Sequence, residues 1–462
     1  MKKLLITLCS AALVLSCGSE GRDPGDGTPI KPPVVVPPAT TYTDAELITM
    51  VQSDVLKYFW DYAESNSKLS RERYHTDEPN ADANTVAVGG SGFGLMTILV
   101  GINNGNISKS EAVSRLTTAL NYLEKADRFH GAWPHWLDGV TGKVKPFSSN
   151  DDGADLVETA FLTQGLICVR EYFKNSTNAA EKALATKADD LWKGVEWNWF
   201  TQGQNVLYWH WSPNYGFVKG MKLQGFDETL ITYVLAASSP NHSISKEVYQ
   251  QGWARNGGIR NSGSQYGIPL VVNHNGASAS VGPMFWSHYS FLGLDPRGLS
   301  DEYVNYGDAV VNHAKIMYQY SLTNPKGWGG YSNKNWGLTA SYSRKPDGST
   351  GYSAHSPTND LGIVSPTAAL SNMPYTPAES MNMLRFLYNE NKDKYVGVAG
   401  PYDAYSTHYN WVTPRYLGID QGTISPMIEN SKNGFIWNLF MNAPEIKTGL
   451  KKLGFTSSKY GI

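Results

Sequence analysis

The apolar residues of this chain recur at the spacing of an α-helix over most of its length. Leu47, Val51 and Val55 follow the 3.6-residue period, and Thr43 with Glu46 forms a capping box in front of them. No series of short strands at the spacing of a sandwich is evident. The sequence therefore predicts one all-α domain of about a dozen helices.

The same period and the usual helix-start residues predict further helices along the chain. Two of them have capping boxes, Ser108 with Glu111 and Thr376 with Glu379, and the second has a proline at its first helical position. The remaining predicted helices cover residues 154–173, 178–197, 227–237, 281–292, 300–320 and 428–441.

Long loops rich in glycine, tryptophan, tyrosine and asparagine separate these helices. Examples are Phe129–Trp136, Tyr208–Trp211 and Trp328–Tyr352. Long loops in a compact domain are usually functional. A helical toroid accounts for both features, because its inner helices line a funnel while the connecting loops form one rim.

The N-terminus is predicted to be an export signal of the lipoprotein type. Met1-Lys2-Lys3 is basic, the run from Leu4 to Leu15 is apolar, and Val14-Leu15-Ser16-Cys17 is typical of a bacterial lipobox. The apolar run is too short to remain as a membrane span. We expect residues 1–16 to be removed and Cys17 to be lipidated; the alternative is an ordinary secretory signal with an incidental cysteine.

Residues 17–42 are rich in proline and glycine and are predicted to form a semi-rigid tether before a single domain at 43–462. A lipid and a tether would hold that domain at the bacterial cell envelope, on the outer membrane or the periplasmic side, with the lipid as its only membrane contact. Once Cys9 and Cys17 are set aside, Cys168 is the one remaining cysteine, so no intramolecular disulfide is expected. The core must therefore supply the stability.

The composition narrows the choice of partner. The formal net charge is −2, charged residues make up 17% of the chain and aromatic residues 12%. A nearly neutral chain has no basic surface for nucleic acid. A neutral carbohydrate, recognised by stacking and hydrogen bonds, fits this composition, with a monomer as the expected state.

Asn150–Ala160 contains the densest group of acidic residues. In a helix, Asp151, Asp155 and Glu158 would share one stripe and repel each other. Carboxylates crowded beside aromatic residues are what glycosidic bond cleavage requires. The alternative is that Asp152 and Asp155 cap the helix and complement its dipole, which leaves Glu158 unexplained.

A second acidic pair, Asp227 and Glu228, precedes another apolar helix. Helix capping is the favoured interpretation for Asp227, whereas Glu228 is the better candidate for catalysis. Asp420 and Glu429 lie in later segments and are slightly more typical of structural acids.

Several catalytic and cofactor motifs are excluded. Gly89–Gly94 is not a dinucleotide loop, because Leu95 takes the place of its last glycine and no strand is predicted before it. Phosphate-loop and paired-histidine zinc motifs are missing as well. His130 and His135 stand five residues apart in a predicted loop, where a sugar-binding or packing role is favoured over a metal site. We expect no metal and no cofactor.

Four motifs together resemble the glycoamylase-like family that includes glycoside hydrolase family 144, the bacterial β-1,2-glucanases. They are Gly89–Gly94, Lys125–Trp136, Asp155–Ala160 and Ser356–Asp360, and the resemblance extends from about Asp54 to Glu445. It implies an (α/α)6 toroid, export to the envelope, and endo or exo hydrolysis of β-1,2-glucan with inversion.

By position, the resemblance assigns the family's important acids to Asp151, Asp155, Glu158 and Glu228. It places Trp133 and His135 in the sugar-contacting loop. We add Arg128 and Trp136 from the same loop, and Trp209 and Trp411 from other aromatic loops, as substrate-binding candidates. Glu228 is favoured as the general acid because burial and neighbouring charge would hold its proton, with the Asp155 and Glu158 cluster as base or water-positioning group.

Two rival functions remain. A lipid-anchored glycan-binding protein would also be helical and rich in tryptophan, but it would have no need of mutually repelling acids. A polysaccharide lyase acts on acidic sugars and usually needs a basic groove, which the near-neutral charge does not support. A hydrolase of the same fold acting on another β-glucan is a third alternative.

Overall fold

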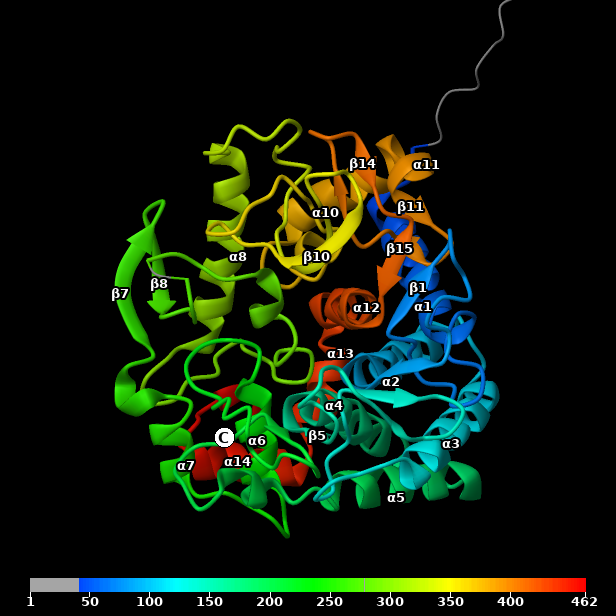
Figure 1. Ribbon diagram of the computed structural model, residues 1–462, viewed down its shortest axis with the longest axis vertical. Helices are drawn as coiled ribbons and strands as arrows, with labels where there is room; N and C mark the ends of the chain where they lie inside the picture. The colour runs from blue at the N-terminus through cyan, green and yellow to red at the C-terminus, as the bar shows by residue number, and fades with distance from the viewer. Residues whose placement is uncertain (1–40, 278) are drawn as a thin grey trace, which may run out of the picture. The chain divides into compact units, whose positions relative to one another are not determined.

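Helices dominate the computed structural model, which describes residues 41–277 and 279–462 (Figure 1). The predicted signal, the lipidation site at Cys17 and almost all of the tether lie outside the described residues. The α-helices are α1 Asp44–Trp60, α2 Val88–Asn103, α3 Lys109–Lys125, α4 Leu156–Phe173, α5 Ala179–Lys193, α6 Leu230–Ser238, α7 Lys246–Gln251, α8 Tyr306–Thr323, α9 Pro366–Leu370, α10 Pro377–Arg385, α11 Lys392–Tyr395, α12 Gly418–Asn433, α13 Phe435–Met441 and α14 Pro444–Leu453.

Short 3₁₀ turns and one π turn connect some of these helices. The 3₁₀ turns are Trp197–Thr201, Arg255–Gly257, Met284–Ser287 and Ser458–Tyr460, and the π turn is Phe386–Glu390.

The strands are short and lie in the loops. They pair into antiparallel sheets of two or three strands, so among residues 41–277 and 279–462 no sheet barrel forms. The strands are β1 Arg73–His75, β2 Thr85–Ala87, β3 Trp136–Asp138, β4 Val144–Lys145, β5 Ala154–Asp155, β6 His210–Trp211, β7 Arg260–Gln265, β8 Ile268–Val272, β9 Ala340–Arg344, β10 Thr350–Ala354, β11 Val396–Gly397, β12 Gly400–Pro401, β13 Tyr405–Ser406, β14 Trp411–Val412 and β15 Arg415–Leu417.

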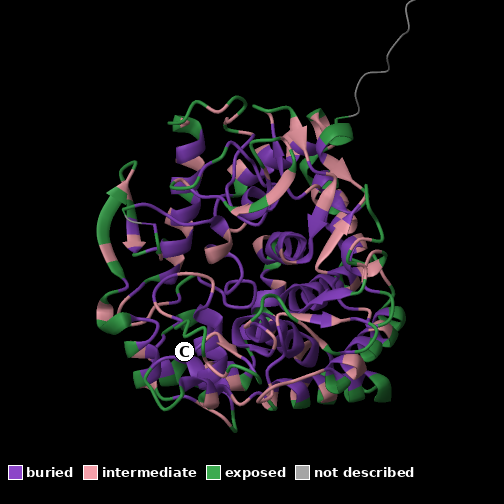
Figure 2. Ribbon diagram, viewed as in Figure 1, coloured by how far each residue is buried: buried purple, intermediate pink, exposed green. Residues whose placement is uncertain are grey.

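Helices α2, α4 and α12 form the centre of the unit Thr41–Ile462, and nearly all of their residues are buried (Figure 2). Apolar and small residues cover almost the whole circumference of α2, so this helix has to be surrounded by protein. Helices α3 and α5 lie at the periphery in Figure 1 and bury only one face. Among the described residues, no helix has both the length and the apolar character of a membrane span.

Glycines bring α2 and α4 unusually close together. A Cβ atom on Gly92 would lie 2.1 Å from the carbonyl oxygen of Phe161, and one on Gly89 would lie 2.4 Å from Oε2 of Glu158. Gly89–Gly94 is thus the packing face of a helix. Strand β2 does precede it, contrary to the sequence prediction, but the glycines continue directly into α2 and leave no dinucleotide loop.

Several predicted helix starts are confirmed. Thr43 Oγ1 accepts from the backbone N–H of Glu46, whose carboxylate accepts from Thr43 N at 2.8 Å. Ser108 caps α3 by accepting from Glu111 N at 3.2 Å. Pro377 is the first residue of α10, but the capping box predicted there is wrong, because Thr376 makes no side-chain capping bond.

Three predicted helices differ from the structure in type or extent. Only a 3₁₀ turn, Met284–Ser287, forms within 281–292, where Pro283 is extended and the Ser290 hydroxyl bonds to the backbone of Glu228 and Ile231. The prediction 428–441 is divided between α12 and α13, because Gly434 adopts φ +71° and ends α12. The start predicted at residue 300 moves to Tyr306, after the N-cap Asn305.

Candidate active site

Asp155 organises the acidic cluster at the start of α4. It is the N-cap residue, and its Oδ1 accepts hydrogen bonds from Val157 N at 3.0 Å and Glu158 N at 2.9 Å. The same oxygen accepts from Trp209 Nε1 at 2.9 Å. Strand β5 pairs with β6 so that Asp155 lies opposite His210.

Two histidines flank the second oxygen of Asp155. His135 Nδ1 lies 2.9 Å and His210 Nε2 3.6 Å from Oδ2. Burial opposes the charge of His135, but Glu158 and Asp155 outweigh it and raise its pKa to about 9, so the ring is an imidazolium at neutral pH. Although burial tends to raise the pKa of Asp155, its hydrogen bond to His135 and the neighbouring charges hold that pKa below the usual value. Asp155 is therefore ionised.

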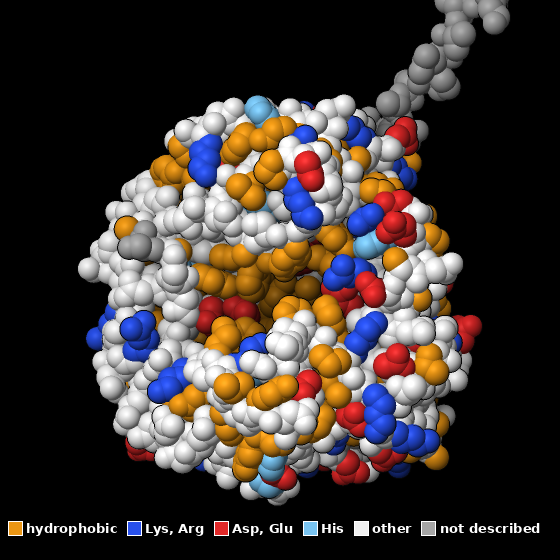
Figure 3. All heavy atoms as spheres, viewed as in Figure 1, with side chains coloured by type: hydrophobic (Ala, Val, Ile, Leu, Met, Phe, Trp, Pro, Cys, Tyr) orange, Lys and Arg blue, Asp and Glu red, His pale blue; other side chains and the backbone are white. Residues whose placement is uncertain are grey.

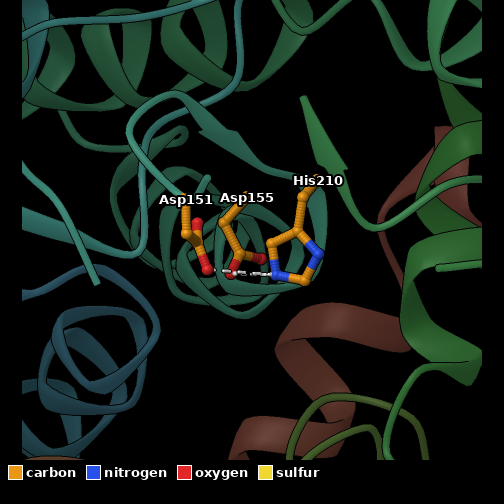
Figure 4. Close-up of side chains that lie close together, drawn as sticks. All are labelled: Asp151, Asp155 and His210. Carbon is orange, nitrogen blue, oxygen red and sulfur yellow. Dashed lines mark ion pairs between the residues drawn. The ribbon is translucent and has the colours of Figure 1, made fainter. Parts of the chain in front are cut away.

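Asp151 joins the cluster from the loop before β5 (Figure 4). Its Oδ2 lies 3.5 Å from His210 Nε2 and 2.9 Å from Lys219 Nζ. The predicted helical stripe of Asp151, Asp155 and Glu158 is wrong, because residues 154–155 are extended and only Glu158 lies within the helix. The turn before α4 brings the three acids together instead. The cationic side chains of His135 and Lys219 offset part of their repulsion.

Glu158 lies in the first turn of α4 and faces α2. Its Oε2 accepts from Gly89 N at 2.8 Å, an approach that a side chain at residue 89 would block. Burial, together with the charges of Asp155 and Asp151, raises the pKa of Glu158 to about 7, although His135 acts in the opposite direction. Glu158 thus changes protonation near neutral pH.

Glu228 and Asp227 precede α6, which packs against α4. Asp227 accepts from Thr229 N at 2.9 Å and from Asn275 Nδ2 at 2.8 Å, so its contacts are structural. The predicted helix cap is wrong, however, because the N-cap of α6 is Thr229. The Glu228 carboxyl makes no hydrogen bond within residues 41–277 and 279–462. Burial, followed by the charges of Asp227, Glu158 and Asp155, raises the pKa of Glu228 well above its usual value. Glu228 therefore retains its proton where an ordinary glutamate has lost it.

We expect Asp227→Asn to shift the alkaline limb of the pH–activity profile to lower pH. Burial raises the pKa of Asp227 to about 6, so above that pH its negative charge helps to keep Glu228 protonated. Removing the charge lowers the pKa of Glu228, and the protonated form disappears at a lower pH. A kcat profile across the alkaline range tests this. An unmoved or upward-shifted limb would show that another group sets it.

A further acidic pair, Asp403 and Asp420, lies beneath the β9–β10 hairpin. Asp420 Oδ1 accepts from Tyr289 OH at 3.1 Å, and Asp403 Oδ2 accepts from the backbone of Tyr342 at 2.7 Å. Burial raises the pKa of Asp403 to about 6 and that of Asp420 well above its usual value, where the Asp403 charge adds to the effect. Sequence analysis missed Asp403, which stands in a loop without any motif, and favoured a structural role for Asp420.

A deep hollow opens at the face of the molecule shown in Figure 3. Hydrophobic side chains line most of it, and acidic side chains are visible at its edge and floor. A concave apolar surface with a few carboxyl groups is the usual form of a site for a neutral organic substrate.

The structure contradicts the predicted substrate contact of Trp133. Its side chain is 0% exposed, and its indole N–H donates to the carbonyl oxygen of Leu123 at 3.1 Å. Arg128 stacks on this ring at 3.9 Å and donates to the carbonyl oxygens of Gly131 and Leu191. Trp133 therefore supports the loop from within the core, and packing accounts for every contact of Arg128.

Three other predicted aromatic residues are partly exposed. Trp209 donates to Asp155, and Trp136 lies in β3 next to His135. Trp411 lies in β14 and packs on a small cluster of Tyr342, Ile363, Ala404 and Leu417, away from Asp155 in sequence and in contacts. Substrate binding by Trp136, Trp209 and Trp411 stays a prediction.

Known proteins resemble this chain over nearly all of the described unit. Residues 220–444 match the family model described as "Glycoamylase: Putative glucoamylase". The structure of an endo-β-1,2-glucanase from Chitinophaga pinensis, in complex with sophorotriose and glucose, is 51% identical, with a TM-score of 0.88 over 91% of this chain and 100% of that one. The chain belongs to glycoside hydrolase family 144.

Two relatives of this family 144 protein are longer than it is. An exo β-1,2-glucooligosaccharide sophorohydrolase (non-reducing end) of Parabacteroides distasonis is 42% identical in an alignment of 439 positions, which covers 90% of this chain and 59% of the relative. The structure of a β-1,2-glucanase from the same species is 40% identical, with a TM-score of 0.83 over 89% of this chain and 60% of that one. The chain thus spans about three fifths of the length of the curated relative.

One group of side chains in the family 144 site has the composition of a metal site. Donor atoms of Asp151, Asp155 and His210 lie within 4.8 Å of one another. However, Lys219 already binds Oδ2 of Asp151, and the His135 imidazolium binds Oδ2 of Asp155. A cationic side chain thus already binds Oδ2 of each aspartate, and we assign no metal here.

We expect Trp133→Ala to lose stability, with little change in KM for the protein that still folds. Removing a fully buried tryptophan costs about 3–5 kcal/mol of the free energy of unfolding. Denaturant unfolding measures the loss, and the partly exposed Trp136→Ala provides the contrast. A raised KM with unchanged stability would show that Trp133 contacts the substrate after all.

Proposed function

We propose that this family 144 protein is a glycoside hydrolase that cleaves β-1,2-glucan or its oligosaccharides with inversion, by endo or exo action. The observation that carries the proposal is the contrast between two carboxyl groups, one in α4 and one in the turn before α6. Glu228 is held protonated without a hydrogen-bond partner among the described residues, while Glu158 titrates near neutral pH. Environments that separate the pKa values of two carboxyl groups are what assign acid and base roles.

Glu228 is the proposed general acid. The proton on its carboxyl is available for the glycosidic oxygen of the leaving sugar, because no described residue accepts it. The negative charges at Asp155 and Glu158 oppose ionisation of Glu228. When the leaving group takes the proton, the carboxylate left behind must be reprotonated before the next turnover.

Glu158 is the member of the α4 cluster best suited to be the general base. Both oxygens of Asp155 already accept hydrogen bonds, three at Oδ1 and one at Oδ2. The carboxylate of Asp151 is bound to Lys219, and its other oxygen is buried. Oε1 of Glu158 has no hydrogen bond to a described residue and can accept a proton from the attacking water. Asp155 then orients His135 and the start of α4.

The placement of acid and base on different elements is compatible with inversion. In an inverting site the two carboxyl groups stand about 6.5–9.5 Å apart, which leaves room for a water molecule. Glu228 precedes α6 and Glu158 lies in α4, and these two helices pack side by side. Acid and base would then act across the hollow rather than along one helix.

We extend the proposal to the architecture and the cellular location. The inner ring of an (α/α)6 toroid would consist of α2, α4, α6, α9, α12 and the turn Met284–Ser287. The outer ring would consist of α1, α3, α5, α7, α8 and α10. This alternation along the chain supports the toroid. The lipobox-like sequence at Cys17 supports an anchor at the bacterial envelope.

Product analysis on linkage-defined β-glucans tests the activity. We expect turnover of β-1,2-linked chains, with the α-anomer as the first product. NMR spectra recorded before mutarotation is complete identify this anomer. A first product with the β-configuration would exclude inversion. Absence of turnover on every β-glucan, with binding retained, would favour a glycan-binding protein instead.

A further inference from the structure

An exposed aromatic ring that no sequence motif indicated lies beside the acidic cluster. Phe147 follows β4 and is 49% exposed, a large apolar surface to leave in water. Its ring centroid lies 4.3 Å from that of His135 and 4.9 Å from that of Trp136. Trp133, the ring expected to contact the sugar, is fully buried.

The backbone fixes Phe147 relative to the acids. Phe147 N donates to the carbonyl oxygen of Asp151 at 3.0 Å, and Asp151 N donates to the carbonyl oxygen of Ser148 at 3.0 Å. This small turn connects the exposed ring directly to a residue of the acidic cluster. Below the ring, the hydrogen bond from His135 Nδ1 to Asp155 fixes the imidazole.

Two of these three aromatic residues also present unused hydrogen-bond donors. Within residues 41–277 and 279–462, neither Nε2 of His135 nor Nε1 of Trp136 has a hydrogen-bond partner, and neither atom is fully buried. His135 is charged at neutral pH, so its Nε2 carries a hydrogen and donates. An apolar ring next to two N–H donors matches a sugar ring, which has an apolar C–H face and hydroxyl groups around its edge.

We propose that Phe147, His135 and Trp136 form one glucosyl-binding subsite, in which Phe147 stacks on the sugar ring and the two N–H groups bind its hydroxyls. This inference rests on the proposed function and deepens it. Because His135 is bonded to Asp155, a sugar in this subsite would be positioned relative to the acids of α4. Phe147 is a substrate-positioning residue with no part in proton transfer.

Binding is measured best in a protein that does not turn over its ligand. In a Glu228→Gln background, calorimetric titration with sophorotriose gives the affinity. We expect Phe147→Ala to raise Kd by roughly 5- to 20-fold, since the stacking interaction is lost. Phe147→Tyr, which retains the ring, should stay within about twofold. Trp136→Phe, which keeps a ring but removes one donor, should raise Kd by about three- to tenfold.

Val140→Ala is the matched control, because Val140 is 58% exposed in the turn between β3 and β4 of the same hairpin. Its affinity should equal that of the parent, and thermal melts should show that every variant folds. In the otherwise wild-type enzyme, Phe147→Ala should raise KM more than it lowers kcat. An affinity of Phe147→Ala within twofold of the parent would overturn the subsite.

Titration with β-1,3- and β-1,4-linked oligosaccharides separates this inference from the proposed function. If the protein binds one of these and not sophorotriose, and Phe147→Ala weakens that binding, the subsite holds while the proposed linkage fails. If sophorotriose binds and Phe147→Ala has no effect, the proposed β-1,2 linkage stands and the subsite fails. A parent that binds no oligosaccharide overturns both.

Discussion

Glu228→Gln is expected to lower kcat by about 10²- to 10⁴-fold, the contribution of a general acid. The carboxyl makes no hydrogen bond to a described residue, so the amide loses no structural contact. The substitution also removes a group whose charged form burial disfavours. The folded state should therefore be at least as stable as that of the wild type, and the loss should appear in kcat rather than in thermal melting.

The role of Glu228 as an acid has a specific signature. Substrates with a good leaving group, such as aryl glycosides, need little help from an acid, so they should recover much of their rate in Glu228→Gln. Glu247→Gln, at an exposed glutamate in α7, is the matched control and should behave as the wild type. Retention of more than about a tenth of wild-type kcat on glucan would remove Glu228 from the catalytic role.

Much of the helical framework could be predicted because its determinants are local. The capping residues Thr43 and Ser108 and the proline at 377 mark helix starts within a few residues of sequence. The segment 281–292 has a similar apolar content but does not form an α-helix. There the Ser290 hydroxyl bonds to the backbone of Glu228 and Ile231 at the start of α6. This contact spans about 60 residues of sequence, so no local pattern contains it.

The acids themselves could be found from sequence, but not their arrangement. The spacing of Asp151, Asp155 and Glu158 suggested one helical stripe, whereas β5 pairs with β6 and holds Asp155 extended as the N-cap. That strand pairing depends on His210, more than fifty residues further along. The cations that stabilise the cluster, Lys219 among them, also come from that distant loop.

The aromatic residues show the same limit. Trp133 and Trp136 stand three residues apart in one motif, yet one is buried in the core and the other is partly exposed. Sequence composition alone gives no means of distinguishing them. Phe147 was missed because it is a lone aromatic residue in a polar loop, and its importance depends on its proximity to His135.

The base is the second group whose removal should have a large effect. Glu158→Gln is expected to lower kcat by about 10²- to 10⁴-fold, since the amide cannot take a proton from water. The amide oxygen can still accept from Gly89 N, so the contact between α2 and α4 is retained. A small anionic nucleophile such as azide should restore part of the rate, because it needs no base, whereas a better leaving group should not.

Asp420→Asn is the comparison that makes this assignment testable. Asp420 is also a buried acid, but its raised pKa and its neighbour Asp403 favour the protonated form, which cannot act as a base. Azide should therefore restore part of the activity of Glu158→Gln. It should restore none of the activity that Asp420→Asn loses. If the pattern is reversed, the base lies beneath the β9–β10 hairpin and α4 only positions the substrate.

Removing the Glu158 charge should also lower the pKa of Glu228, so the residual activity should decline at a lower pH on the alkaline side. A shift in the opposite direction would mean that the two carboxyl groups do not face each other across the hollow.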